Sequence, residues 1–240
     1  MSNLGLKIFA VSSAVFSFVS FASADDGWKN ESQAGVVMTS GNTETTTLSF
    51  GEAASYSFTA NLFKFTGAYL YQKTGTVVSA ESWNLGLRYE RSLSDRISAF
   101  LAETVEGNQF SGINQRYMTD LGAKAFLVKD EGFTWLGEGG YRFTKENLIV
   151  VQRNLHYARF YTELEKKVNA TVSAKYWVEY LPNFTISNDW QLNTELSLSA
   201  ALSSVFSIKS AYLIRYDNQV NAVGLVPTDR TLTTSLVAKF

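Results

Sequence analysis

The sequence predicts an all-β protein: a single antiparallel β-barrel of about twelve strands that spans a membrane. Three observations predict this fold. Apolar and polar residues alternate with a two-residue period in segments along most of the chain. Most of these segments are about ten to twelve residues long, which exceeds the usual strand of a soluble sheet but suits a tilted membrane crossing. Short gaps between segments alternate with longer ones, as in barrels of the bacterial outer-membrane type.

The predicted strands follow one another without a linker or a low-complexity tract, so we expect one domain over residues 25–240. The segment 190–202 illustrates the pattern. Its even positions are apolar apart from Thr194, and its odd positions are polar apart from Ala201. In chain order the predicted strands are 28–39, 45–56, 62–71, 81–90, 96–106, 116–127, 133–143, 155–167, 171–181, 190–202, 206–217 and 230–240.

The gaps indicate which ends of the strands lie on the same side of the membrane. The short gaps are Ser57–Asn61, Arg91–Asp95, Val128–Gly132, Val168–Ala170 and Ser203–Val205. The clearly longer gaps are Gln72–Ala80, Gly107–Gln115, Thr144–Asn154 and Asn218–Asp229, whereas Pro182–Asp189 is moderate and Ser40–Glu44 is a tight exception. We expect the short turns and both termini to face the periplasm, and the longer loops, Thr144–Asn154 and Asn218–Asp229 among them, to lie outside the cell.

The last strand ends on an aromatic residue, Phe240, with no polar tail after it. A closed barrel satisfies every backbone donor and acceptor laterally, so a final strand paired with the first needs no cap. We expect Phe240 to act both as an interfacial aromatic and as the signal that the barrel assembly machinery reads.

The N-terminus has the features of a secretory signal peptide over residues 1–24. A short positively charged segment precedes an apolar run, and Ala22-Ser23-Ala24 has the small-x-small form of a cleavage site after Ala24. Without Lys7, 20 of the 21 basic residues remain against 22 acidic ones, giving a net charge near −2. This charge does not favour nucleic-acid binding. The absence of cysteine excludes disulfide stabilisation.

A soluble β-sandwich or lipocalin-like barrel is the main alternative fold. It does not explain the aromatic residues at the ends of the apolar sets, such as Trp83 with Tyr89 and Phe206 with Tyr216. Aromatics at both edges with aliphatic or small residues between them are typical of two interfacial girdles. The same pattern predicts contact with outer-membrane lipids and lipopolysaccharide.

Two stretches resemble a known family. "SGNTETTTLSFG" at 40–51 and "NQRYMTDLGAKAFLVKDEGFTWLGEGGYRF" at 114–143 are similar to the salt-induced outer-membrane proteins, also called domain of unknown function 481. The resemblance covers most of the mature chain. It implies an outer-membrane barrel associated with envelope stress, and it implies no reaction or ligand. Asn108 stands where the family pattern has an acidic residue before the Phe of the third loop.

The sequence offers little for catalysis or for a cofactor. The only imidazole is His156, and the residues after it, Tyr-Ala-Arg-Phe, contain no serine that could act as its nucleophile. No cluster of cysteine, histidine or carboxylate residues has the spacing of a metal site. We therefore predict no enzyme, no cofactor and no metal.

The polar residue set predicts the inner wall of the barrel. It contains eight basic and eight acidic candidates for the lumen: Lys64, Arg88, Glu90, Asp120, Lys124, Glu138, Arg142, Arg159, Glu163, Glu165, Lys175, Glu179, Glu195, Lys209, Arg215 and Lys239. Twelve strands lie between the filled interior of eight and the aqueous channel of sixteen. Facing charges such as Arg142 and Glu163 could brace the barrel, whereas a wet lumen would conduct ions with weak selectivity.

Two acidic residues disagree with this alternation. Glu52 and Glu103 fall in the lipid-facing set if their strands are unbroken. A charge there costs more free energy near the bilayer midplane than at its rims. A β-bulge in each strand would turn the side chain inward.

Three functions follow from these observations. The first is a narrow outer-membrane pore for ions or small solutes. The second is a structural or binding barrel with a side-chain-plugged lumen, whose loops contact lipopolysaccharide or a partner. The third is a lipid-modifying enzyme that uses His156, which the missing nucleophile disfavours. The sequence predicts neither a solute nor an oligomeric state.

Overall fold

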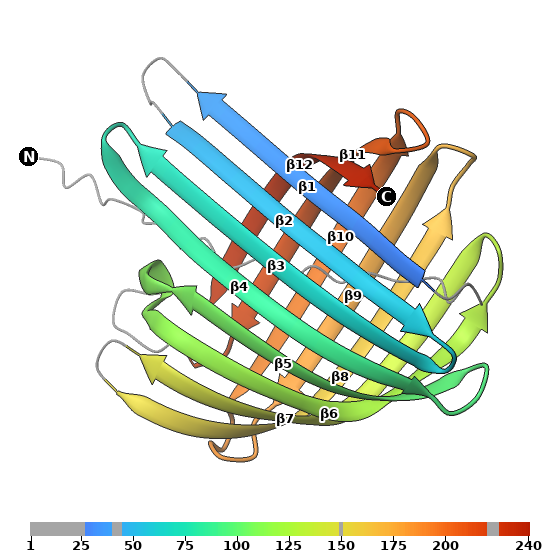
Figure 1. Ribbon diagram of the computed structural model, residues 1–240. Helices are drawn as coiled ribbons and strands as arrows, with labels where there is room; N and C mark the ends of the chain where they lie inside the picture. The colour runs from blue at the N-terminus through green and yellow to red at the C-terminus, as the bar shows by residue number, and fades with distance from the viewer. Residues whose placement is uncertain (1–26, 40–44, 149–150, 220–225) are drawn as a thin grey trace, which may run out of the picture.

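The computed structural model describes residues 27–39, 45–148, 151–219 and 226–240. In these residues twelve antiparallel strands form one closed barrel, in which each strand pairs with its sequence neighbours and β1 pairs with β12 (Figure 1). The predicted fold class is confirmed. The predicted signal peptide, its cleavage at Ala24 and the turn at 40–43 lie outside the described residues.

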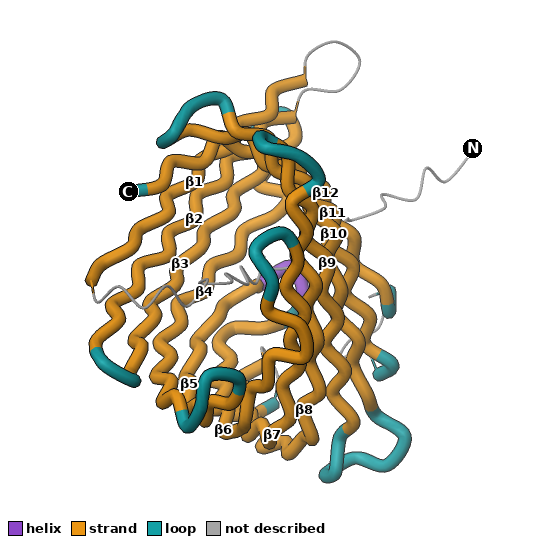
Figure 2. The backbone as a smooth tube through the Cα atoms, turned by 90° about the vertical axis from the view of Figure 1, so that its right-hand side faces the viewer, coloured by secondary structure: helices purple, strands orange, loops and turns teal. Residues whose placement is uncertain are grey.

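Strands account for nearly all of the described chain, and a single helical turn joins β5 to β6 (Figure 2). The elements are β1 (Gly27–Thr39), β2 (Thr45–Phe58), β3 (Asn61–Thr74), β4 (Val77–Ser92), β5 (Ile97–Asn108), η1 (Gln109–Ser111), β6 (Ile113–Lys129), β7 (Phe133–Leu148), β8 (Gln152–Lys167), β9 (Val172–Pro182), β10 (Trp190–Ala201), β11 (Phe206–Asp217) and β12 (Thr228–Lys239). Within the described residues no helix is long and apolar enough to cross a bilayer.

The two ends of the barrel differ. We call the end with Gly27, Phe240 and the short turns the turn end, and the opposite end the loop end. At the loop end three hairpins are longer than the sequence predicts. The expected loops at 72–80, 107–115 and 144–154 are mostly strand, because β4 begins at Val77, β6 at Ile113 and β8 at Gln152.

This difference has a physical reason. The alternation of apolar and polar residues can be recognised in the sequence only where the outward residues face lipid and must be apolar. Beyond that band the outward positions carry charges such as Glu81 and Lys145, yet Lys145 still pairs with Asn154 in the register of β7 and β8. Backbone pairing therefore continues after the apolar signal has ended. The tight connection from β3 to β4 is helped by Gly75, whose positive φ of 59° suits glycine.

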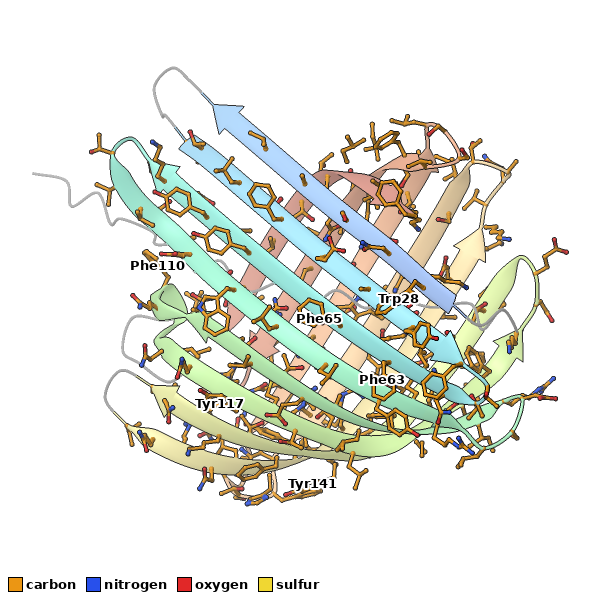
Figure 3. The ribbon with its side chains drawn as sticks, in the orientation of Figure 1. Trp28, Phe63, Phe65, Phe110, Tyr117 and Tyr141 are labelled. Carbon is orange, nitrogen blue, oxygen red and sulfur yellow. The ribbon has the colours of Figure 1, made fainter. Side chains whose placement is uncertain are left out.

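The outer face carries aromatic rows at both ends. At the turn end, neighbouring rings of Trp28, Tyr56, Phe58, Phe63 and Tyr89 lie 5.0, 5.7, 6.1 and 5.0 Å apart between centroids. Trp28 and Phe63 are labelled in Figure 3, with Phe65 farther along β3. A second row at the loop end joins Tyr180, Trp190 and Tyr216, with centroids 5.9 and 4.8 Å apart. Two such rows are typical of barrels that cross a bilayer.

The core of the protein is the inside of the barrel. A buried apolar cluster joins Phe126, Leu136, Tyr161, Trp177 and Leu213, which come from five different strands. All five side chains point inward, from the same alternating positions of their strands as the charged residues. These five side chains therefore pack against one another inside the barrel.

β1 and β12 close the barrel through a short seam. β1 pairs with β2 from Gly27 to Thr39, but its register with β12 joins only Glu31–Ala34 to Leu236–Lys239. Phe240 lengthens this seam, because its N–H donates to the carbonyl of Asn30 at 2.9 Å and its carbonyl accepts from the N–H of Asn30 at 3.0 Å. Phe240 thus contributes to closure through its backbone.

We expect deletion of Phe240 to abolish assembly, because it removes two backbone hydrogen bonds of the seam together with a ring that is 74% exposed. The variant should accumulate outside the membrane or be degraded, as judged by fractionation and heat-modifiable electrophoretic migration. Phe206→Ala is the matched control, because it removes another exposed turn-end ring and keeps its backbone paired. Normal membrane levels of the deletion variant would contradict this role.

The absence of cysteine allows orientation to be tested with single labels. Ser187 and Ser204 are exposed and lie at the loop end and the turn end. We expect Ser187→Cys to react with an impermeant maleimide in intact cells, and Ser204→Cys to react only after the outer membrane is permeabilised. The opposite pattern would reverse the orientation.

Candidate functional site: the charged interior of the barrel

A connected network of charged side chains fills the middle of the barrel. Arg88 on β4 contacts Glu138 on β7 at 2.7 Å, although β5 and β6 lie between these strands. Glu138 also contacts Arg159 on β8 at 2.7 Å, and Arg159 contacts Glu179 on β9 at the same distance. Arg142 joins Glu179 at 3.1 Å to Asp120 at 2.6 Å, both measured from nitrogen to oxygen. These pairs link five strands around the interior, β4, β6, β7, β8 and β9, and brace them against one another.

Glu90 is the second junction of this network. Arg88 contacts it at 2.7 Å and Lys64 at 3.9 Å, and Lys124 forms a close ion pair with it. The side chain of Glu90 is only 4% exposed. Three cations thus converge on one buried carboxylate, which offsets the cost of removing it from water. Asn193 on β10 extends the network by donating to Glu179 at 3.0 Å.

An aromatic ring supports the arginines. Phe100 on β5 points inward, and the guanidinium carbon of Arg88 lies 3.8 Å from its ring centroid. Arg159 lies over the same ring at 5.8 Å. Space for the ring comes from glycine, since a Cβ added to Gly122 would lie 2.8 Å from Cζ of Phe100. Gly122 leaves room for the ring of Phe100, and the cation–π contacts of this ring hold Arg88 and Arg159 in place across the lumen.

Smaller clusters lie toward each end. At the loop end Arg116 contacts Glu106 at 2.8 Å and Glu146 at 2.7 Å, and Arg153 contacts Glu146 at 2.5 Å. At the turn end the pairs are Lys175 with Glu163 at 3.0 Å, Lys209 with Glu195 at 3.7 Å and Lys239 with Glu31 at 3.0 Å. Ion pairs therefore occur along the whole length of the lumen.

All sixteen lumen candidates occupy the inward set of their strands. Nine belong to the central network, namely Lys64, Arg88, Glu90, Asp120, Lys124, Glu138, Arg142, Arg159 and Glu179. Six lie toward the turn end, namely Glu163, Glu165, Lys175, Glu195, Lys209 and Lys239, and Arg215 lies toward the loop end. Glu165 stands opposite Lys175 in the register of β8 and β9.

The expected pairing of Arg142 with Glu163 is wrong. In the register of β7 and β8, Arg142 stands opposite Tyr157 and Glu163 opposite Leu136. Arg142 pairs instead with Asp120 and Glu179, and Glu163 accepts from Lys175 and Tyr161. Alternation predicts the face of a residue, but only register predicts its partner.

Sequence reasoning missed several charged residues on the inward sets, among them Glu31, Glu106, Arg116, Glu146, Arg153, Asp217 and Asp229. Glu146 and Arg153 fell in the expected loop at 144–154, which is strand. Continuing the inward set of β7 from Arg142 by two steps would have found Glu146. Glu106 shares its inward set with Phe100, so the apolar and polar sets of that strand could not be told apart by composition.

One part of the wall is uncharged. Between the Glu31–Lys239 pair and Asp229, the inward residues of β12, β1 and β2 are small, hydroxyl, amide or apolar. A cavity of about 20 Å³ there is lined by both polar and apolar residues, Gln33, Ser49, Leu70 and Thr233 among them. A cavity needs roughly 10–15 Å³ to hold one water molecule, so this space suits about one or two waters.

Glu52 and Glu103 stay on the lipid-facing set, so the expected rescue by a β-bulge does not occur. The registers that pair Glu52 with Ser32 and Gly67, and Glu103 with Leu87, run without a shift. Each carboxylate instead accepts from a hydroxyl on a neighbouring strand. Ser32 donates to Glu52 and Thr119 donates to Glu103, both at 2.6 Å.

His156 lies on the outward set near the loop end. Its Nδ1 is hydrogen-bonded to the hydroxyl of Tyr141, and its ring centroid lies 5.3 Å from that of Phe143. Within the described residues no serine hydroxyl is hydrogen-bonded to it. The described residues also contain no group of three or more histidines or carboxylates that could hold a metal ion. Asn108, where the family pattern has an acid, is buried and caps η1 by accepting from the N–H of Ser111 at 3.1 Å.

Comparisons with known proteins give a family and a fold. The family described as "Protein of unknown function, DUF481" matches residues 32–240. No curated protein matches the sequence. The chain is similar to an outer-membrane channel from Pseudomonas putida F1, with a TM-score of 0.53 and 8% identity, over 94% of this chain and 99% of that chain.

Two further solved structures are similar at a lower score. The NanC porin has a TM-score of 0.49 and 10% identity, over 88% of this chain and 97% of that chain. The translocator domain of the autotransporter NalP from Neisseria meningitidis also scores 0.49, with 11% identity, over 92% of this chain and 90% of that chain. The P. putida likeness shows the barrel fold alone.

Removal of one network cation should destabilise the barrel strongly. Arg159→Met leaves Glu138 and Glu179 with fewer partners in a desolvated interior, so we expect a loss of about 3–5 kcal/mol in the free energy of unfolding. Lys239→Met removes a pair whose lysine is 61% exposed, and should cost at most about 1 kcal/mol. Urea unfolding in lipid vesicles measures both. Equal losses would mean that the interior is hydrated.

Proposed function

We propose that this chain, which belongs to the DUF481 family, is an outer-membrane barrel of the structural or ligand-binding kind that keeps its lumen closed. The observation that carries the proposal is the connected ion-pair network from β3 to β9, packed against Phe100. The cell location is supported by the aromatic rows, by the outward apolar residues and by the predicted signal peptide. The association with envelope stress stays a prediction.

Closure rests on burial around the interior. The inward residues Phe100, Leu155 and Trp177 are 2, 1 and 2% exposed, and Val237 on the uncharged wall is 1% exposed. A water-filled channel would leave such residues accessible to solvent. The cavity beside Gln33 has room for about one or two waters, which is too little for a hydrated ion.

The charges also suit a brace better than a filter. A selective pore uses rings of one sign to favour ions of the other sign. Here Arg88, Arg142 and Arg159 each contact carboxylates directly, so their charges are neutralised within the wall. Paired charges held by several strands resist deformation of the barrel. We therefore place function at the surfaces of the barrel rather than in transport through it.

Planar-bilayer recording tests this proposal. We expect the wild-type chain to give no stable conductance steps. The triple variant Arg88→Ala, Phe100→Ala, Arg159→Ala removes the plug and leaves Glu90, Glu138 and Glu179, so it should conduct and prefer cations.

The matched control shifts each substitution by one residue. Leu87→Ala, Leu101→Ala, Phe160→Ala changes outward side chains that are 56, 51 and 55% exposed on the same strands. It should stay closed. Steady wild-type conductance would instead support the narrow pore for ions or small solutes.

A further inference from the structure

The outer face of the barrel has a hollow that extends from β12 across β1, β2 and β3 to β4. It is shallow and open to its surroundings, with a volume of about 680 Å³. Its lining includes the outward residues Ser32, Ala34, Phe50, Glu52, Phe65 and Leu236. Small residues on β1, β3 and β12 make the floor, and larger apolar side chains surround it.

One polar pair interrupts this apolar lining. The hydroxyl of Ser32 donates to Oε2 of Glu52 at 2.6 Å. No other described residue forms a hydrogen bond or an ion pair with Glu52. A carboxyl group keeps acceptor capacity in either protonation state, so the hollow offers an acceptor that the protein leaves partly unused.

The position of Glu52 limits what could bind there. It lies four residues along β2 from Tyr56 of the turn-end aromatic row. At about 3.4 Å per residue and a tilt of about 40°, this is about 10 Å from that row toward the middle of the apolar band. Ionic head groups stay near the interface because moving them into hydrocarbon is costly. A neutral donor carried partway along an acyl chain can reach this depth.

Glu103 provides a comparison within the same molecule. It is also on the lipid-facing set and also accepts from one hydroxyl, that of Thr119 at 2.6 Å. It is absent from the lining of the hollow. A lipid-facing carboxylate alone therefore indicates no site, whereas Glu52 combines the acceptor with a shaped apolar space.

We propose that this hollow binds the acyl chain of a membrane lipid that carries a hydroxyl group along the chain. Phe50, Phe65 and Leu236 would contact the chain, and Glu52 would accept from its hydroxyl. The inference rests on the membrane location proposed above and is independent of whether the lumen is closed.

Two neutral probes that differ by one hydroxyl test it: methyl 3-hydroxytetradecanoate and methyl tetradecanoate. Native mass spectrometry of the full chain in phosphatidylcholine nanodiscs gives their apparent affinities. A hydrogen bond to a carboxylate in an apolar site should favour the hydroxylated ester by about tenfold or more. Glu52→Leu should abolish this preference and still bind the plain ester, because it leaves the apolar walls intact.

Two further variants serve as controls for the carboxylate and for the hollow. Glu103→Leu removes the comparable carboxylate outside the hollow and should preserve the preference. Ala34→Trp fills the hollow and should weaken both esters. Equal binding of the two esters by the wild type, or loss of the preference in Glu103→Leu, would overturn the inference. If fractionation finds the chain outside the membrane, the proposed function fails too; if it is in the membrane and the esters bind alike, only this inference fails.

Discussion

The rest of the structure depends on one constraint: inside a bilayer, every backbone N–H and C=O needs a partner within the protein. A sheet meets it only by closing on itself, and here closure depends on a seam of few residues between β1 and β12. Phe240 and Asn30 exchange two backbone hydrogen bonds at one end of this seam. The least extensively paired junction of the barrel therefore lies at its chain ends, and the outer hollow extends from this junction to β4.

Closure also fixes what the interior must contain. Strands alternate, so each crossing that presents apolar residues to lipid presents its other side chains to the lumen. Charges placed there lose water and must find partners. The arginines meet this need by bridging strands, as Arg88 reaches Glu138 past β5 and β6. In the closed barrel that we propose, the same pairs that satisfy the buried charges would also keep the lumen shut.

The alternation predicts most of this architecture, and the features that it does not predict have physical reasons. Strand number, order and inward sets follow from a period of two that lipid enforces. The strand ends at the loop end do not follow from this period, because outward residues there face water and need not be apolar. Glu146 therefore lies in a segment that the sequence predicts to be a loop. The ion-pair partners do not follow from it either. Arg142 pairs with Asp120 and Glu179 because of the strand register, which cannot be predicted from a single sequence. For Glu52 the sequence predicts a β-bulge. Instead, the hydroxyl of Ser32 on the next strand donates to the carboxylate, and the backbone pairing of the strands is unbroken.

The central claim is that the network is a desolvated brace rather than a set of hydrated charges. A double-mutant cycle between Arg88 and Glu138 tests it most directly, because the pair joins strands that are not neighbours. The double change removes one charge of each sign and leaves Glu90 with Lys124 and Arg159 with Glu179. The free energy of unfolding should fall less for Arg88→Met with Glu138→Gln than for the sum of the single changes. Strict additivity of the two single changes would contradict the claim.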